Sequence, residues 1–114
     1  TSIMRRFPGI FFRMVPGDSE SFIFASPGAE ILTGYTPGDL VEKRIDFHAL
    51  IFPEDLGKVR EARDSAISSG GSYQVSYRLL TRTGSEKRVK ETGFCIESGR
   101  GPSLEGYILD IDTL

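Results

Sequence analysis

The feature that most constrains the fold is the alternation of apolar and polar residues in the stretch 71–114. One face of its first run is apolar, with Tyr73, Val75, Tyr77 and Leu79 at every second position. This period of two is typical of a β-strand with one buried face. A second alternating run covers 86–97, and an apolar strand follows at 107–109. Short glycine-containing turns separate the runs, so the stretch predicts three antiparallel strands whose buried face needs a cover.

The first quarter of the chain predicts a strand hairpin. Residues 9–15 and 21–25 are both rich in aromatic and branched side chains, and the turn-forming residues Pro16, Gly17, Asp18 and Ser19 separate them. Added to the later three strands, this hairpin gives a five-stranded antiparallel sheet.

The middle of the chain predicts helices that cover the sheet. Ser26 and Pro27 suit the N-cap and first position of a short helix that ends at Gly34. Thr36 and Asp39 have capping-box spacing. A longer helix is predicted between Pro53 and Gly70, with apolar residues at helical spacing at Leu56, Val59, Ala62, Ala66 and Ile67. The fold class is therefore α+β, with short helices and one longer helix packed on one face of the sheet.

The composition of the chain bounds its class. At 114 residues with 39% hydrophobic content, residues 1–114 fit a single domain. A net charge of −2 argues against nucleic-acid binding, and no apolar run is long enough to cross a membrane. The single cysteine forms no internal disulfide, which fits a cytoplasmic setting. Because the chain lacks an initiator Met and stops abruptly, we expect a domain cut from a longer protein.

The segment 26–35 reads SPGAEILTGY, and residues 110–112 read Asp-Ile-Asp. Together with several further motifs in order, they resemble the PAS domain, the sensory-box fold of bacterial signalling proteins. Segment 26–35 is similar to the family's Asn-Pro-Ala-Ala-Glu-x-Leu-Thr-Gly-Tyr motif, with Ser in the Asn place. Residues 7–13, 53–55, 77–79, 83–85 and Gly106 also fit the family pattern, and residues 110–112 resemble its terminal Asp-Ile-Thr. The resemblance covers nearly all of the chain and implies the PAS fold.

The resemblance implies a sensory or regulatory module without catalysis of its own, within a sensor histidine kinase or a cyclic-dinucleotide enzyme. Asp110, Ile111 and Asp112 would then pass the signal to a following helix. The alternative is a ligand-free dimerisation module that uses Ile3, Met4 and Phe7. The expected partners are a second copy of the chain, adjacent signalling domains and a small-molecule ligand.

The sequence offers little for catalysis or for a metal. His48 is the only histidine, and we expect it to be a partly buried or surface residue without a catalytic partner. Cys95 lies on a late strand, where packing is the expected role. The light-sensing relatives bind flavin covalently through a cysteine before the long helix, and the oxygen-sensing relatives hold haem through a histidine on it. This chain has neither residue there, so covalent flavin and haem are disfavoured, while non-covalent flavin stays open and the cofactor is unknown.

Two further groups of residues have competing interpretations. Residues expected to line the inner space form either a small-molecule pocket or a filled core, and the filled core is favoured: Phe24, Tyr35, Phe47, Ile51, Val75 and Tyr77. The basic residues of the hairpin form either an anion patch or a solvated strand face: Arg78, Arg82, Lys87, Arg88 and Lys90. Because Glu86 and Glu91 are interspersed among them, the solvated face with ion pairs is favoured.

Overall fold

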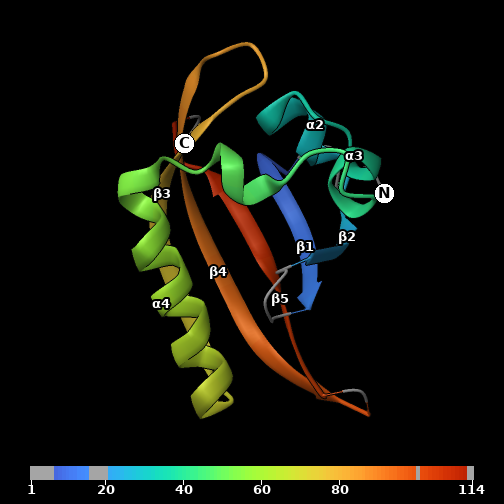
Figure 1. Ribbon diagram of the computed structural model, residues 1–114, viewed down its shortest axis with the longest axis vertical. Coiled ribbons are helices and arrows are strands. Elements are labelled where there is room, and N and C mark those ends of the chain that lie inside the picture. Colours follow the sequence, from blue (N-terminus) through green and yellow to red (C-terminus); the bar gives the residue numbers. More distant parts are fainter. Residues whose placement is uncertain (1–6, 16–20, 100, 113–114) are drawn as a thin grey trace.

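The architecture is a five-stranded antiparallel sheet with helices on one face, as the sequence predicts (Figure 1). The computed structural model describes residues 7–15, 21–99 and 101–112. The strands are β1 (Gly9–Val15), β2 (Ser21–Ala25), β3 (Ser72–Leu80), β4 (Glu86–Ser98) and β5 (Gly101–Asp110), in the spatial order β2-β1-β5-β4-β3. The pairing of β1 with β5 joins the N-terminal hairpin to the later three strands.

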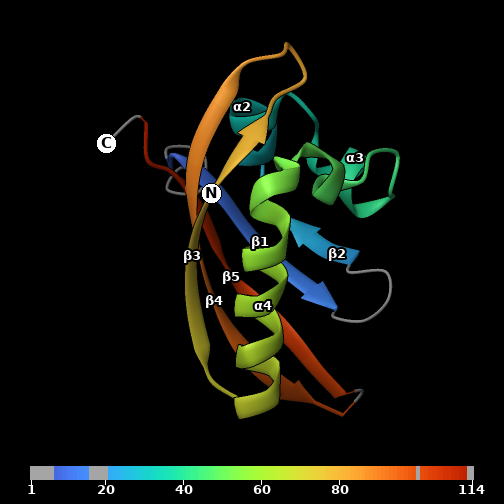
Figure 2. The same ribbon diagram turned by 60° about the vertical axis from the view of Figure 1, so that its left-hand side comes forward.

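In the described part of the chain, four helical segments cover this sheet, namely α2 (Gly28–Thr33), α3 (Pro37–Val41), the 3₁₀ turn η1 (Phe47–Leu50) and α4 (Pro53–Ser69). Figure 2 shows α4 lying along the β3–β4 side of the sheet, while α2 and α3 cover the β1–β2 side. We call the helix-covered face the inner face and the opposite one the outer face. The core lies between the inner face and the helices, where Ile10, Met14, Val59, Leu104 and Ile108 are fully buried.

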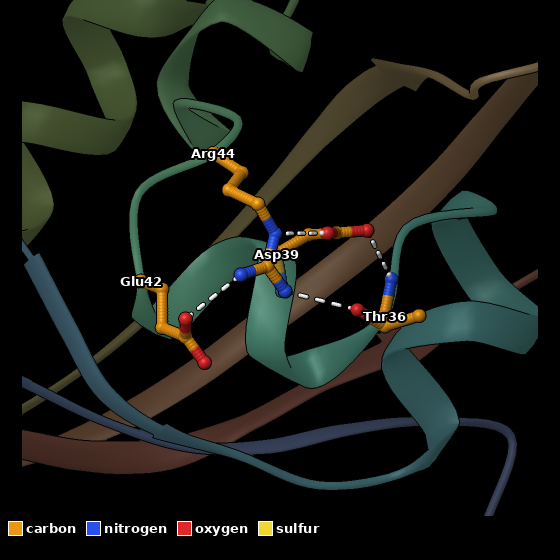
Figure 3. Close-up of polar contacts among 4 residues, drawn as sticks. All are labelled: Thr36, Asp39, Glu42 and Arg44. Carbon is orange, nitrogen blue, oxygen red and sulfur yellow. Dashed lines mark hydrogen bonds and ion pairs between the residues drawn. The ribbon is translucent and has the colours of Figure 1, made fainter.

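The two short helices begin differently. At α3 the Thr36 hydroxyl accepts a hydrogen bond from the Asp39 amide, and the Asp39 carboxylate accepts one from the Thr36 amide, which confirms the capping box. Arg44 lies between Asp39 and Glu42 and pairs with both, so the segment after α3 folds back onto it (Figure 3). The N-cap predicted at Ser26 is wrong, since its hydroxyl accepts a hydrogen bond from Phe11 of β1 instead.

The long helix follows the prediction closely. It begins at Pro53 and ends before Gly70, whose φ of 68° is the left-handed conformation that glycine adopts easily. The Asp55 carboxylate binds the Arg78 guanidinium through two hydrogen bonds of 2.9 Å and also accepts one from the Arg78 amide. The hydrogen bonds from Arg78 lower the pKa of Asp55 to about 2. This contact fixes the start of α4 against the end of β3.

Candidate functional site

A buried ion pair occupies the middle of the inner layer, between α4 and the sheet. Arg63 of α4 and Glu91 of β4 are both 0% exposed. The Arg63 Nε and one terminal nitrogen donate to the two Glu91 carboxylate oxygens at 2.9 and 3.0 Å, which is the bidentate arrangement. Such a pair is removed from water at a large cost, so its geometry and its other hydrogen bonds determine whether it is tolerated.

Two tyrosines of β3 complete the shell around the Glu91 carboxylate. Glu91 is paired across the strands with Val75, and Tyr73 and Tyr77 lie two residues to either side of Val75. Both hydroxyls therefore reach the carboxylate, with Tyr77 Oη 2.6 Å from one oxygen and Tyr73 Oη donating to the other. Gly93 makes room for the Tyr73 ring, because a Cβ there would lie 2.4 Å from a ring carbon.

The protonation states of these groups follow from their surroundings. Burial alone would raise the pKa of Glu91, but the charge and hydrogen bonds of Arg63, together with the tyrosine hydroxyls, outweigh it and lower that pKa. Burial and the neighbouring carboxylate raise the pKa values of Tyr73 and Tyr77. The tyrosines are therefore neutral donors and Glu91 is an ionised acceptor. No buried side-chain nitrogen or oxygen in the described part of the chain lacks a hydrogen-bond partner.

His48 of η1 extends this network toward the surface. Its Nε2 lies 2.6 Å from the Arg63 Nη1, and its Nδ1 lies 3.2 Å from an Asp46 carboxylate oxygen. The imidazole is 7% exposed, whereas the Asp46 side chain is 71% exposed. His48, which the sequence predicted to be partly buried or on the surface, is thus a buried member of a polar network. We call Arg63, Glu91, Tyr73, Tyr77 and His48 the inner network.

The sequence did not predict the positions of two members of this network. Glu91 was assigned to a solvated strand face, which is wrong, and Arg63 was not singled out. The signals were nevertheless present. Glu91 follows the fully buried Val89 by two residues, which places both on the same face of β4, while Arg63 lies four residues after Val59 on the buried face of α4.

The six residues predicted to line the inner space do not all lie there. Phe47, Ile51 and Tyr77 are buried in the inner layer, and Val75 and Tyr35 are partly buried against the core. Phe24 is 44% exposed on the outer face, so its assignment to the inner wall is wrong. A bulge is the reason, since the β1–β2 register shifts between Arg13 and Met14 and the alternation of β2 is broken.

The segment that follows β5 is fastened to the beginning of β4. The buried Asp110 carboxylate accepts hydrogen bonds from Lys87 Nζ at 3.2 Å and from the Asp112 amide at 3.0 Å. The Asp112 carboxylate accepts from the backbone and Nε of Arg88, both at 2.9 Å, and the Ile111 amide donates to the Arg88 carbonyl. The bonds from Arg88 lower the pKa of Asp112. We call residues 110–112 the exit segment.

Three of the five basic residues of the hairpin are held by carboxylates, as expected for a face with ion pairs. Their partners differ from the expected Glu86 and Glu91, because Arg78 pairs with Asp55, Lys87 with Asp110 and Arg88 with Asp112. The Arg82 guanidinium instead lies over the Tyr35 ring, 5.7 Å from its centroid. Cys95 is partly buried and packs against the core.

The outer face carries an open apolar depression. We call its members the outer-face patch: Phe11, Ile23, Phe24, Phe94, Ile96 and Tyr107. The exposed fractions of Ile23, Phe24 and Phe94 are 49%, 44% and 48%. Arg13 and Glu105 form an ion pair within it, and the Phe7 ring stacks on Phe11 with centroids 4.3 Å apart. Ile3 and Met4, the other predicted dimer contacts, lie outside the described residues.

The described residues show neither a metal cluster nor a membrane-crossing helix. No group of three or more His, Cys, Asp or Glu side chains in residues 7–15, 21–99 and 101–112 is arranged to hold a metal ion. Over the same ranges, every helix is too short or too polar to span a bilayer.

Comparisons with known proteins agree on one family. The family model of the PAS fold matches residues 22–108 of this sequence. A "methyl sulfide methyltransferase-associated sensor" of Methanosarcina acetivorans is 32% identical over 81 residues, which is 68% of this chain. The matched part is about 8% of the length of that curated relative.

Solved structures share the architecture. The N-terminal domain of a diguanylate cyclase with a PAS/PAC sensor from Marinobacter aquaeolei superposes with a TM-score of 0.76 at 21% identity, over 92% of this chain and 96% of that one. A domain of a light and redox sensing histidine kinase from Haloarcula marismortui gives 0.74 at 22% identity, over 96% and 95%. At these identities the likeness shows the fold.

Proposed function

This chain belongs to the PAS fold family, and we propose that it is a sensory module that passes the state of its interior to its exit segment. The observation that carries the proposal is that one strand, β4, contacts both the inner network and the exit segment. Glu91 reaches from β4 into the inner network, and Lys87 and Arg88 of the same strand hold residues 110–112. A change in the position of β4 would therefore alter the contacts of both the inner network and the exit segment.

We assign no catalysis to this domain and infer that it works within a larger cytoplasmic signalling protein. The similar domains of a diguanylate cyclase and a histidine kinase support a cyclic-dinucleotide enzyme or a sensor kinase as the whole protein. The physical device would be a sheet with two arrangements, between which a ligand or a partner selects. Covalent flavin and haem stay disfavoured, because the chain has no cysteine just before α4 and no histidine on it. A small-molecule pocket between the helices and the sheet stays a prediction.

The coupling between interior and exit segment can be tested by amide hydrogen exchange. Glu91→Gln removes the buried charge but keeps the shape of the side chain. We expect exchange at the Ile111 and Asp112 amides to become about fivefold faster or more, the lower end of typical couplings between sites. Lys90→Gln is the matched control, because Lys90 neighbours Glu91 on β4 but faces the outer side of the sheet.

A reference amide separates coupling from general loss of stability. The Ser26 amide donates a hydrogen bond to the Phe11 carbonyl at 2.9 Å. Phe11 lies on β1, near the edge of the sheet opposite β3. If Glu91→Gln accelerates exchange at Ser26 as much as at Ile111, the proposed route is wrong. Asp110→Asn is the positive control, since it weakens the exit segment directly.

A second candidate function is self-association through the outer face. Exposed apolar side chains gathered in one depression are typical of interaction sites. The occupant we propose is a second copy of the chain, because Arg13 and Glu105 lie side by side within the patch. A two-fold axis there would bring each charge onto its opposite in the partner, as isologous interfaces require.

Sedimentation equilibrium at micromolar concentration tests this association. Phe94→Ser should weaken the dimer at least about tenfold, as truncation of a central aromatic residue does. Leu80→Ser is the control, because Leu80 is also 48% exposed but pairs with Glu86 at the other end of β4. A monomeric parent chain, or a dimer that Phe94→Ser leaves unchanged, would refute the interface.

A further inference from the structure

His48 stands at the point where the inner network meets the protein surface. On one side its Nε2 is 2.6 Å from Arg63 Nη1, in the middle of the inner layer. On the other side its Nδ1 is 3.2 Å from the carboxylate of Asp46, which is largely exposed. The ring thus links a fully buried cation to a solvated anion.

The contact with Arg63 fixes the protonation state of the ring. A guanidinium has only N–H donors and stays protonated at any pH that a protein survives. The His48 Nε2 must therefore accept, which requires a neutral imidazole with its proton on Nδ1. Asp46 accepts that proton's hydrogen bond and so selects the same tautomer.

Protonation would turn this attraction into a repulsion. A proton on Nε2 would place two positively charged donors face to face at 2.6 Å. Arg63 cannot turn aside without leaving Glu91, which Tyr73 and Tyr77 also hold. Among the charged groups that contact the ring, Arg63 would oppose its protonation and Asp46 would favour it, while Glu91 is already paired with Arg63. The ring would therefore move toward Asp46 and solvent.

We propose that His48 is a pH switch, in which uptake of one proton breaks its bond to Arg63 and releases the η1 turn from α4. The turn is built into the core on either side of this residue. The Phe47 ring packs edge-on against Phe22, with centroids 5.1 Å apart, and Ile51 forms a β-bridge with Leu79. Displacing His48 thus disturbs contacts with both β2 and β3.

This switch goes beyond the proposed function and does not depend on it. It concerns how the interior responds to acid, whereas the proposed function concerns how the interior acts on residues 110–112. An acid response at η1 without a change at the exit segment would support the switch alone.

The first test is nitrogen-15 NMR of the unmodified chain. Because His48 is the only histidine of the sequence, its two ring nitrogens are assigned without ambiguity. At pH 8 we expect the proton on Nδ1 and a bare Nε2. On titration to pH 5, the amides of 46–52 should shift in step with ring protonation. A proton on Nε2 at pH 8 would overturn the proposal.

The second test compares the acid dependence of stability with that of His48→Gln. The glutamine amide oxygen can accept from Arg63 in the place of Nε2 but takes up no proton. An ordinary histidine titrates near pH 6.5 when unfolded. Complete exclusion of the proton from the folded state would make the unfolding constant of the parent chain rise about 30-fold more than that of the variant between pH 8 and pH 5. Protonation of the folded ring within this range, which the switch requires, makes the rise smaller than this limit but still greater than that of the variant.

The sign and the control follow from the same linkage. The unfolded chain binds the extra proton, so stability is present above pH 6.5 and is lost as pH falls. Carboxylates titrate in both proteins and cancel in the ratio. Equal pH dependence of the two proteins would overturn the switch. If the variant does not fold, the NMR measurements on the unmodified chain still decide it.

Discussion

The two faces of the sheet solve opposite problems. The inner face buries charge, since Arg63 and Glu91 are completely removed from solvent and every donor and acceptor around them is matched. The outer face exposes apolar area, with Phe24 and Phe94 nearly half exposed. It carries its own ion pair, Arg13–Glu105, whose side chains are 51% and 35% exposed. The two pairs join the same residue types, so the difference between them isolates what burial does.

The contrast is clearest on β4, where hydropathy predicts the wrong face of the sheet for two residues. Glu91 points into the protein and Phe94 points out of it. The strand alternates regularly, so the alternation of direction is kept while that of polarity is not. Such departures from the simple pattern are expected where a protein spends stability on function. The inner network and the outer-face patch are the places to test.

The largest effect should come from breaking the inner pair on one side only. Glu91→Ala leaves the Arg63 charge buried without its partner, and we expect a loss of about 3–5 kcal/mol in the free energy of unfolding. Urea denaturation at pH 7.5 measures it. Replacing both members at once, Arg63→Met with Glu91→Leu, should recover the part of this loss that comes from the unpaired charge, while the Tyr73 and Tyr77 hydroxyls still lack their acceptor. A double variant as unstable as Glu91→Ala would contradict that account.

A smaller, pH-dependent effect is expected at the margin of the inner layer, where Asp55 binds Arg78. The pKa of Asp55 is about 2, held down by the hydrogen bonds from Arg78, against 3.8 in an ordinary Asp. A depressed pKa gives stability above pH 3.8 that is lost as the pH falls through 2. Because the Arg78 side chain is 38% exposed, screening reduces the contribution to about 1 kcal/mol.

Asp55→Asn tests this window, since the amide oxygen can still accept from the Arg78 backbone. Thermal unfolding between pH 5 and pH 2 should show a flatter acid limb in the variant than in the parent chain. His48 is present in both proteins, so it does not account for a difference between their acid limbs. An identical acid limb in both proteins would show that the Asp55 pair contributes nothing to acid sensitivity.

The sequence predicted the framework well because the framework depends on local patterns. Period-two runs identified β3 and β4, and runs rich in aromatic and branched side chains beside turn residues identified β1, β2 and the end of β5. The capping box at Thr36 and the glycine at position 70 marked helix boundaries correctly. The PAS resemblance rested on the same local motifs. The errors arose where distant residues decide. The bulge opposite Arg13 turned Phe24 outward, and Phe11 of β1 took the hydroxyl of Ser26.

The inner network was harder to predict because a charge is assigned to solvent unless its partner is known. Arg63 and Glu91 are 28 residues apart, and no local sequence motif at either residue predicts the ion pair. The periodicity of α4 and β4 placed each on a buried face, which was the available signal. His48 is similar, since its role depends on Arg63, 15 residues away. The resemblance singled out Asp110 and Asp112, whereas their partners Lys87 and Arg88 were not predicted.

The smallest effect should come from the outer ion pair, measured by a double-mutant cycle of Arg13→Ala and Glu105→Ala. Both side chains reach solvent, so their coupling should be at most about 1 kcal/mol and should shrink further in 0.5 M salt. The same cycle on Arg63 and Glu91 should give several times that value with little salt dependence, because water and ions do not reach the pair. The comparison is made on monomeric protein at low concentration, where self-association does not shield Arg13 and Glu105. If the outer pair couples as strongly as the inner one, burial is not what separates the two faces.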